Sequence, residues 1–474
     1  MANIKEQLNQ YSPHKKILSN ISWISEKLMM PAYVVGGYVR DILLNKEITD
    51  IDIMVEGDGI KFAKELSKKL NVDNLVIYEK FQTALIPHKE LQIEIATART
   101  EEYDVTSRKP KIKSTTIHED LSRRDFTINA IAASMNKNDY GNIIDPFNGM
   151  NDLKKKIIIT PIDPNETFRE DPLRMLRAIR FAAQLNYKID KNVLKAIKKQ
   201  RNRLEIISWE RITEEIIKSL KTDKPSIAFY LFKETNLLSY IFPEINIMSG
   251  VDVIDGHTHK DVFIHTLQVV DNAAKLTNKI DIRFAALVHD IAKPNTKKFI
   301  PEKGWTFHGH DNIGSHMIYN IAKRMKLSNK LRDYLSLMTK LHLRPIALVK
   351  KNITDSAIRR LMVDAGDHID DLMILCRADI TTKNEMKIKK YRSNFERVEK
   401  LMHNVVMRDQ MRAFQSPIRG EEIMKILQIE PSKEVGDIKK IIENAILDGV
   451  IENTHKDALK YMLQIKDTIL NKTH

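Results

Sequence analysis

The chain has 474 residues, 42% of them hydrophobic and 30% charged, which suffices for about three packed domains. Its net charge of +14 favours a polyanionic partner such as nucleic acid, although a lysine-rich proteome would give the same excess. The single cysteine excludes an internal disulfide framework, the N-terminus lacks a secretory signal, and no apolar run approaches the ~18 residues of a membrane helix, so we expect a cytoplasmic protein without a membrane partner.

Short strand-like runs are concentrated in the first third of the chain. They are rich in β-branched residues or alternate between apolar and polar, at residues 32–37, 49–55, 74–80, 83–88, 91–97 and 126–134. A helical pattern interrupts them at residues 59–70, and a 3.6-residue period dominates from residue 171 onward. The pattern predicts an α+β head followed by a long helical remainder.

Two aspartates alternate with isoleucines in the second strand-like run. Asp50 and Asp52 stand at positions i and i+2, so a strand would point both carboxylates to one face. Such a pair is often only a solvated surface feature. Two like charges this close are unfavourable unless a cation lies between them, and carboxylate oxygens suit Mg²⁺.

Residues around this pair could complete a phosphate site. Gly36 and Gly37 would let backbone N–H groups approach a triphosphate, although a double glycine is more often a plain turn. Arg40 follows one helical turn later and could reach the same phosphates. Glu94, in the run at 91–97, is a candidate third carboxylate for a two-metal, in-line displacement.

An acidic and a basic residue lie close together in the sequence where the helical pattern begins. Asp171 and Arg174 are predicted to be i, i+3 neighbours on one helix, and Arg177 and Arg180 continue this spacing. The pair could be an ordinary surface ion pair. Alternatively, the acceptors of the aspartate and the planar donor fork of the arginine could pair with the Watson–Crick edge of a base.

Histidines and aspartates recur in the middle of the chain. A lone histidine on an apolar helix face is usually a packed core residue, but six such residues within one stretch indicate a metal site, which suits Mg²⁺ or a transition metal. These residues are His265, His289, Asp290, His310, His342 and Asp379.

The motif GGYVRDILLNKEITDID, at residues 36–52, resembles the signature of the tRNA nucleotidyltransferase and poly(A) polymerase family, in its bacterial and eukaryotic class. The family belongs to the polymerase-β-like nucleotidyltransferases. The resemblance continues in the family's order and covers roughly residues 28–220. It runs through residues 93–100, 101–110, 119–132, 170–181 and 207–220, of which 101–110 resembles a flexible loop near the active site.

The resemblance implies roles for the residues singled out above. Asp50, Asp52 and Glu94 would be catalytic, with Mg²⁺ on the two aspartates, and Asp171 with Arg174 would select CTP and ATP without a nucleic-acid template. The remaining nucleotide-binding residues would be Gly36, Gly37, Arg40, Arg124, Arg177 and Arg180. Two further motif residues, Asp120 and Asp125, could contact the ribose or could instead hold arginines or cap a helix.

The histidine-containing segments resemble a second family. HDIAKP, at residues 289–294, and HGHDNIGSH, at residues 308–316, are similar to the HD superfamily of metal-dependent phosphohydrolases. The six-residue ligand set would hold Mg²⁺ or a divalent transition metal. Phosphatase and 2′,3′-cyclic phosphodiesterase activities are what this resemblance implies.

Together these features predict five segments. They are an N-terminal helical segment (1–27), a polymerase-β-like nucleotidyltransferase head with a mixed sheet (28–155), a helical neck (156–245), an HD domain (246–385) and a helical tail (386–474). The tail would hold the acceptor and TΨC arms of tRNA through phosphate contacts.

The expected function is template-independent addition and repair of the 3′-terminal CCA of tRNA from CTP and ATP, with release of pyrophosphate. A poly(A) polymerase, an enzyme adding only CC or only A, and an HD phosphohydrolase with a degenerate RNA-binding head are the alternatives. The loop at 101–110 argues against addition of CC alone. The oligomeric state is left open.

Overall fold

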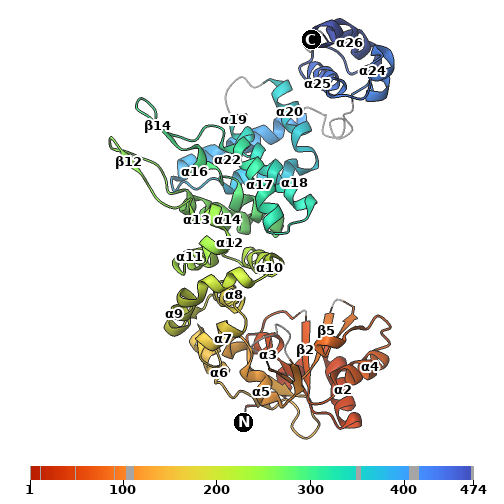
Figure 1. Ribbon diagram of the computed structural model, residues 1–474, viewed down its shortest axis with the longest axis vertical. Coiled ribbons are helices and arrows are strands. Elements are labelled where there is room, and N and C mark those ends of the chain that lie inside the picture. Colours follow the sequence, from red (N-terminus) through yellow and green to blue (C-terminus); the bar gives the residue numbers. More distant parts are fainter. Residues whose placement is uncertain are drawn as a thin grey trace. The chain divides into compact units, whose positions relative to one another are not determined.

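The structure is a computed structural model that describes residues 2–10, 12–48, 50–89, 91–102, 111–348, 354–404 and 416–470. The chain forms two compact units, one of residues 1–222 and 227–241 and the other of residues 223–226 and 242–474 (Figure 1). In the described part of the chain, no helix combines the length and the apolar character that a membrane crossing requires.

The first unit contains a seven-stranded mixed sheet in the order β3-β4-β5-β2-β1-β8-β9. Its central pair, β2 and β5, is parallel, while the other neighbouring strands are antiparallel. The strands are β1 (Ala32–Val35), β2 (Asp50–Val55), β3 (Val76–Tyr78), β4 (Thr83–His88), β5 (Leu91–Thr97), β8 (Ala132–Ser134) and β9 (Ile143–Ile144). The predicted mixed sheet is confirmed.

Helices cover this sheet. The predicted helix at 59–70 is confirmed as α4, where Asp58 caps the N-terminus by accepting from the Lys61 N–H, and it packs on β4 and β5 (Figure 1). The N-terminal helix α2 packs on α4 and β1. The helices of this region are α1 (Lys5–Gln10), α2 (Ser12–Leu28), α3 (Gly37–Leu43), α4 (Gly59–Leu70), α5 (Ile117–Ser122) and α6 (Gly149–Lys155).

The strand predicted at 126–134 forms only in its last three residues. Residues Thr127–Asn129 make a 3₁₀ turn, and β8 follows it. The reason is local hydrogen bonding, because the Asp125 carboxylate accepts from the Phe126 N–H and from the Asn129 amide, which favours a turn over a strand. A separate hairpin, β6 (Arg99–Glu102) and β7 (Lys111–Ser114), flanks the predicted loop, whose residues 103–110 lie outside the described residues.

The helical part of the first unit begins with α7, which Asp163 caps ahead of Pro164 at the first helical position. A short parallel bridge between β10 (Ile157–Ile158) and β11 (Lys188–Ile189) ties it to the head. The elements are α7 (Pro164–Glu170), α8 (Arg174–Leu185), α9 (Lys191–Gln200), η3 (Arg201–Ile206), α10 (Trp209–Leu220), α11 (Ser226–Glu234) and α12 (Leu238–Ile241).

The second unit is mainly helical, as predicted. Its first part comprises α13 (Pro243–Asn246), α14 (Val262–Leu276), α15 (Ile280–Val288), α16 (Lys293–Thr296), α17 (His310–Arg324), α18 (Asn329–Leu341), α19 (Arg344–Ala347), α20 (Asp355–Ala365), η4 (Gly366–His368), α21 (Ile369–Ala378) and α22 (Glu385–Asn404). Two hairpins that the periodicity did not predict are β12 (Val253–Ile254) with β13 (His257–Thr258), and β14 (Lys298–Ile300) with β15 (Gly304–Thr306).

The tail has a hydrophobic core of its own. Ile423, Ile438, Ile442 and Met462 are buried together in it. The core is shared by α24 (Gly420–Leu427), α25 (Lys433–Leu447) and α26 (His455–Leu470).

Candidate functional site

Three carboxylates gather on the central strands of the first unit. The parallel register places Asp52 of β2 opposite Glu94 of β5, so their side chains share one face of the sheet with Asp50. Burial raises the pKa of Asp52 to about 6, with Glu94 and Asp50 adding to the shift and Arg124 opposing it. A divalent cation would relieve this repulsion, and the oxygen donors suit a hard ion, so the residues fit a metal.

The glycine turn lies beside Asp52. Gly36 has a φ of +65°, and a Cβ there would lie 2.6 Å from Nη1 of Arg124. A Cβ on Gly37 would lie 4.0 Å from Oδ2 of Asp52. The two glycines therefore keep side-chain atoms out of the space in front of Asp52.

A cavity of about 500 Å³ opens at this turn. All eight residues predicted to bind the nucleotide line it together with Asp52, whereas Asp50 and Glu94 do not. The eight are Gly36, Gly37, Arg40, Arg124, Asp171, Arg174, Arg177 and Arg180. Residues more than 130 positions apart in sequence thus meet in one space, although their roles there remain predictions.

The predicted placement of Asp171 and Arg174 on one helix is wrong. Asp171 lies in the break between α7 and α8 and has extended backbone angles. Pro172 follows it, and a proline disfavours the helical conformation in the residue before it. Arg174 begins α8 and donates to the Glu170 carboxylate at 2.9 Å and to the Arg123 carbonyl at 2.7 Å. Both side chains still line the cavity, but from a corner rather than from a continuous helix face.

Asp171 has a partner that the sequence did not predict. Its Oδ2 accepts from Nη2 of Arg211 at 2.7 Å, and its Oδ1 accepts from the Leu173 N–H at 3.1 Å. Arg211 itself lines the cavity, one helical turn into α10. No residue-spacing signal pointed to it, because the two residues are 40 positions apart.

Two of the cavity arginines are held by buried carboxylates. Nε of Arg177 donates to Oδ2 of Asp125 at 2.8 Å, and Nε of Arg180 donates to Oε2 of Glu215 at 2.6 Å. Burial would raise the pKa of Asp125, but Arg177 and the Asn129 hydrogen bond together outweigh it and the pKa is lowered. These arginines are oriented by the protein rather than held in open solvent.

Two other arginines are also paired. Arg40 donates to both oxygens of Asp41 and, at 2.7 Å, to the Asn129 amide oxygen. Arg124 lies 3.3 Å from the Asp120 carboxylate. Asp120 and Asp125 therefore hold arginines, and their contact with a ribose stays a prediction.

The sequence motifs did not indicate a role for Glu215. It is only 2% exposed and lies on the apolar face of α10 with Ile212 and Ile216. A glutamate on the apolar side of an amphipathic helix is itself a signal for a buried charge partner. Its position in the sequence, 35 residues after Arg180, gives no indication of which partner that is.

A second site lies in the second unit, where the six predicted metal ligands meet. They come from α14, α17, the ends of α15 and α18, and the residue after α21. Two groups have all their ligand atoms within 4.8 Å of one another: His265, His289 and Asp379, and Asp290, His310 and His342.

Asp290 joins the two groups. Its Oδ1 lies 3.2 Å from Nε2 of His310 and 3.6 Å from Nε2 of His342. Its Oδ2 lies 3.2 Å from Nε2 of His289 and 3.5 Å from Nε2 of His265. One carboxylate therefore faces both groups, as a bridging ligand would.

Backbone carbonyls orient three of the histidines. Nδ1 of His289, His310 and His342 lies 2.9, 2.6 and 2.6 Å, respectively, from a carbonyl oxygen three residues earlier. A carbonyl only accepts, so each Nδ1 carries a proton, and in the neutral imidazole each Nε2 then presents a lone pair to the centre. This is the tautomer that binds a metal.

Buried atoms in this centre lack hydrogen-bond partners. They are Nε2 of His289 and Oδ1 of Asp290, whereas Oδ1 of Asp379 has Nε2 of His265 at 2.9 Å. Unsatisfied buried polar atoms are costly, and both atoms point into one centre. The nitrogen and oxygen donors fit one or two divalent cations.

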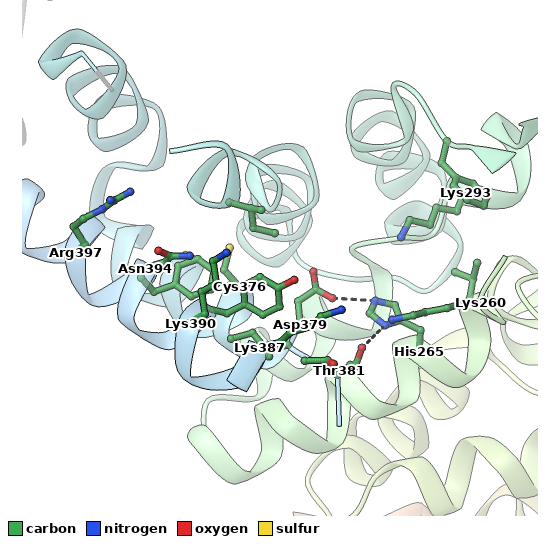
Figure 2. A pocket seen from close by; sticks show the side chains of 17 residues that line it. Lys260, His265, Lys293, Cys376, Asp379, Thr381, Lys387, Lys390, Asn394 and Arg397 are labelled. Atoms are coloured by element: carbon green, nitrogen blue, oxygen red, sulfur yellow. Dashed lines mark hydrogen bonds and ion pairs between the residues drawn. The ribbon is translucent and has the colours of Figure 1, made fainter. Parts of the chain in front are cut away.

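A cavity of about 980 Å³ opens onto this centre through His265 and Asp379. In Figure 2 these two residues lie on one side, and side chains of α22 line the other. Nε2 of His265 is 2.9 Å from Oδ1 of Asp379, and its Nδ1 is 3.1 Å from the Thr381 hydroxyl. The centre is thus reachable from solvent on one side.

Comparisons with known protein families agree with this arrangement. Residues 32–159 match the family described as poly A polymerase head domain, and residues 262–384 match the HD domain. Residues 186–248 match a family described as the probable RNA and SrmB-binding site of polymerase A. The head-domain match contains the three carboxylates and the glycine turn, and the HD-domain match contains the six candidate metal ligands.

Several curated proteins are similar in sequence. An A-adding tRNA nucleotidyltransferase of Aquifex aeolicus is 43% identical over 211 residues, but this match covers 44% of the present chain and only 25% of that protein. The multifunctional CCA protein of Pseudoalteromonas atlantica is 32% identical and covers 76% of this chain and 88% of that protein. The multifunctional CCA protein of Shewanella frigidimarina is 30% identical, covering 86% and 98%.

Solved structures of tRNA-processing enzymes share the fold. One, in its apo form, is 26% identical with a TM-score of 0.59 and covers 92% of this chain and 98% of its own. A tRNA nucleotidyltransferase complexed with a primer tRNA and an incoming ATP analog is 28% identical with a TM-score of 0.57, covering 80% and 99%. The chain therefore belongs to the family of multifunctional CCA proteins, the tRNA nucleotidyltransferases of the poly(A) polymerase type that carry an HD domain.

Proposed function

We propose that the protein adds and repairs the 3′-terminal CCA of tRNA, using CTP and ATP and releasing pyrophosphate in the cytoplasm. The observation that carries the proposal is the 500 Å³ cavity, in which Asp52 and the glycine turn meet Asp171 and Arg174. A metal-binding carboxylate and a base-reading pair are thus available to one bound nucleotide. The names of the multifunctional CCA relatives support the same reaction.

In the proposed reaction, the 3′-hydroxyl oxygen of the RNA forms a bond to the α-phosphorus as the bond to the pyrophosphate oxygen breaks, and the hydroxyl proton is released to solvent. Asp50 and Asp52 would hold Mg²⁺, with Glu94 as a third carboxylate; when bound, the ion lowers the pKa of the hydroxyl and offsets developing charge. Gly36 and Gly37 leave room for the triphosphate. Arg40 and Arg124 would face its phosphates.

Base selection would fall to Asp171 and Arg174. The carboxylate offers acceptors and the guanidinium offers donors, which together can match the Watson–Crick edge of cytosine or adenine. The ion pair between the exposed Arg211 and Oδ2 of Asp171 is worth only ~0–1 kcal/mol. The amino group of a base can therefore donate to Oδ2 beside Arg211 or in its place. Arg177 and Arg180, which Asp125 and Glu215 hold in place, would line the nucleotide site beside this pair.

The second centre would hydrolyse phosphoesters, including 2′,3′-cyclic phosphates. An oxygen of water forms the new bond to phosphorus, one ring P–O bond breaks, and the released ribose oxygen takes up a proton to leave a phosphomonoester. The six ligands from His265 to Asp379 would hold Mg²⁺ or a transition metal, which supplies Lewis-acid activation of water and phosphate when bound. The buried atoms without partners support this assignment.

The transfer reaction is tested with tRNA that lacks its CCA end and with CTP and ATP supplied singly and in sequence. We expect two cytidines to be added from CTP alone and one adenosine after ATP is supplied. Long A-tracts on any RNA would refute the proposal in favour of a poly(A) polymerase. Addition to tRNA ending in CC alone would indicate an A-adding enzyme.

The hydrolytic proposal is tested with the paired variant His289→Ala, Asp290→Ala. It should lose cyclic phosphodiesterase activity, while CCA addition, which uses the other unit, should stay within about twofold. The converse variant Asp52→Asn should lose nucleotidyl transfer by at least about 10²-fold, as is typical when a main electrostatic group is removed. Hydrolysis that persists in the paired variant would show that another site is responsible.

A further inference from the structure

The cavity beside the HD centre has a wall that the HD-domain match does not include. That match ends at residue 384, whereas α22 begins at Glu385. Lys387, Lys390, Tyr391 and Asn394 of α22 all line the cavity. Their spacing of three or four residues places them on one face of the helix, so α22 presents a continuous surface to the metal centre (Figure 2).

The charge of this cavity is strongly unbalanced. It is lined by five basic side chains and one carboxylate: Lys260, Lys293, Lys387, Lys390, Arg397 and Asp379. Lys293 already contacts Oδ2 of Asp290 at 2.6 Å. Among the described residues, no carboxylate lies within ion-pair distance of Lys260, Lys387 or Lys390. Uncompensated positive charge beside a metal centre attracts an anionic ligand.

The wall is longer than a single phosphate requires. Lys387 and Arg397 are ten residues apart, or about 15 Å along the helix axis. At about 3.4 Å per stacked nucleotide, this length matches roughly four nucleotides. Tyr391, which is 42% exposed, lies between these residues and offers a ring on which a base can stack.

We propose that α22 is the substrate-binding wall of the HD centre and that it selects the 3′ end of a single-stranded RNA over a free mononucleotide. Lys387 and Lys390 bind phosphates that precede the scissile one, and Tyr391 stacks against a base. In Figure 2, Lys387 lies toward Asp379 and Arg397 lies toward the opposite end of α22, which gives the strand its path away from the centre. The inference rests on the proposed hydrolytic function of this centre.

The test compares two probes on the full-length, metal-loaded protein: 2′,3′-cyclic AMP and a pentaribonucleotide that ends in a 2′,3′-cyclic phosphate. The wild type should have a KM for the pentanucleotide at least about tenfold lower than that for cyclic AMP. The variant Lys387→Glu, Lys390→Glu should remove this advantage by raising the KM for the pentanucleotide to about that for cyclic AMP. The double variant Lys389→Glu, Lys400→Glu is the charge-matched control, because both lysines are exposed on α22 but neither lines the cavity.

Equal KM values for the two probes in the wild type would overturn the inference, and so would an unchanged preference in the variant Lys387→Glu, Lys390→Glu. If the wild type hydrolyses neither probe, the hydrolytic function itself is refuted. Fluorescence anisotropy with a labelled pentaribonucleotide ending in a 3′-hydroxyl still decides the role of α22. Binding weakened by Lys387→Glu, Lys390→Glu but not by the control Lys389→Glu, Lys400→Glu supports it, and equal binding by the two variants contradicts it.

Discussion

At the scale of single residues, buried ion pairs decide where the cavity arginines point. Arg180 and Glu215 are 6% and 2% exposed, and the guanidinium of Arg180 also lies 3.8 Å from the Phe181 ring centroid. Arg177 lies 3.8 Å from the same glutamate through Nη1. One carboxylate thus helps to position two guanidiniums that face the proposed nucleotide site.

Removing that carboxylate should be costly. We expect Glu215→Gln to lower the free energy of unfolding by about 3 kcal/mol, because it leaves the buried charge of Arg180 without its partner. The neighbouring Glu214→Gln, which breaks a mostly exposed pair with Lys218, should change it by less than about 0.5 kcal/mol. Urea unfolding measures both values, and equal effects would contradict the assigned burial of Glu215.

The pH dependence of stability should report on Asp125. Its folded-state pKa is lowered, since Arg177 and the Asn129 hydrogen bond outweigh burial, so its contribution is present above its unfolded pKa and is lost as pH falls through the folded value. We expect Asp125→Asn to destabilise the protein by about 2–3 kcal/mol at pH 7. The difference from wild type should shrink below about pH 4. A difference that stays constant from pH 7 to pH 3 would argue against this pairing.

Selection among nucleotides should depend on Asp171. We expect Asp171→Ala to reduce the preference for CTP and ATP over UTP and GTP by about tenfold or more, the usual value of one well-placed polar pair with a base edge. The Mg²⁺ concentration for half-maximal activity should not change, because Asp50 and Asp52 are intact. Competition assays with all four nucleotides measure the preference, and an unaltered preference would remove Asp171 from the base-reading role.

At the scale of helices and strands, local sequence patterns predicted the elements well, but not the breaks between them or the contacts that they make. Helix α4 and strand β2 formed where the periodicity placed them. The helical spacing did not predict the break at Asp171, where the following Pro172 disfavours a helical backbone. The ion-pair partners of the cavity residues could not be predicted, since Arg211 meets Asp171 and Glu215 meets Arg180 only when α10 packs on α8.

Close packing between elements gives a further prediction. A Cβ on Gly149, at the start of α6, would lie 2.1 Å from the Thr127 carbonyl oxygen, so Gly149→Ala should destabilise the head by about 1–3 kcal/mol. Gly436, within α25, has no heavy atom within 4 Å of its Cβ position. Gly436→Ala should therefore stabilise that helix by about 0.5–1 kcal/mol. Hydrogen exchange of peptides from each region separates the two effects, and equal behaviour would contradict the packing of α6.

At the scale of the whole molecule, the order of the motifs along the chain anticipated the order of the two centres. The family resemblance predicted six metal ligands in the HD domain, each in a recognisable local motif, and the structure brings these six side chains together. Their role as ligands stays a prediction. The basic face of α22 was not anticipated, since lysines are frequent throughout this chain of net charge +14. Only the folded arrangement shows which of them line a cavity beside the metal ligands.

The central claim is that this one chain completes the CCA end without a template. Its most direct test is to sequence the 3′ ends of tRNA molecules that start without CCA, after incubation with the protein and equal concentrations of all four nucleotides. We predict that CCA will be the predominant end and that few products will extend beyond it. Products that end mainly in A-tracts or in mixed sequences, or tRNA extended only when it already ends in CC, would contradict the claim.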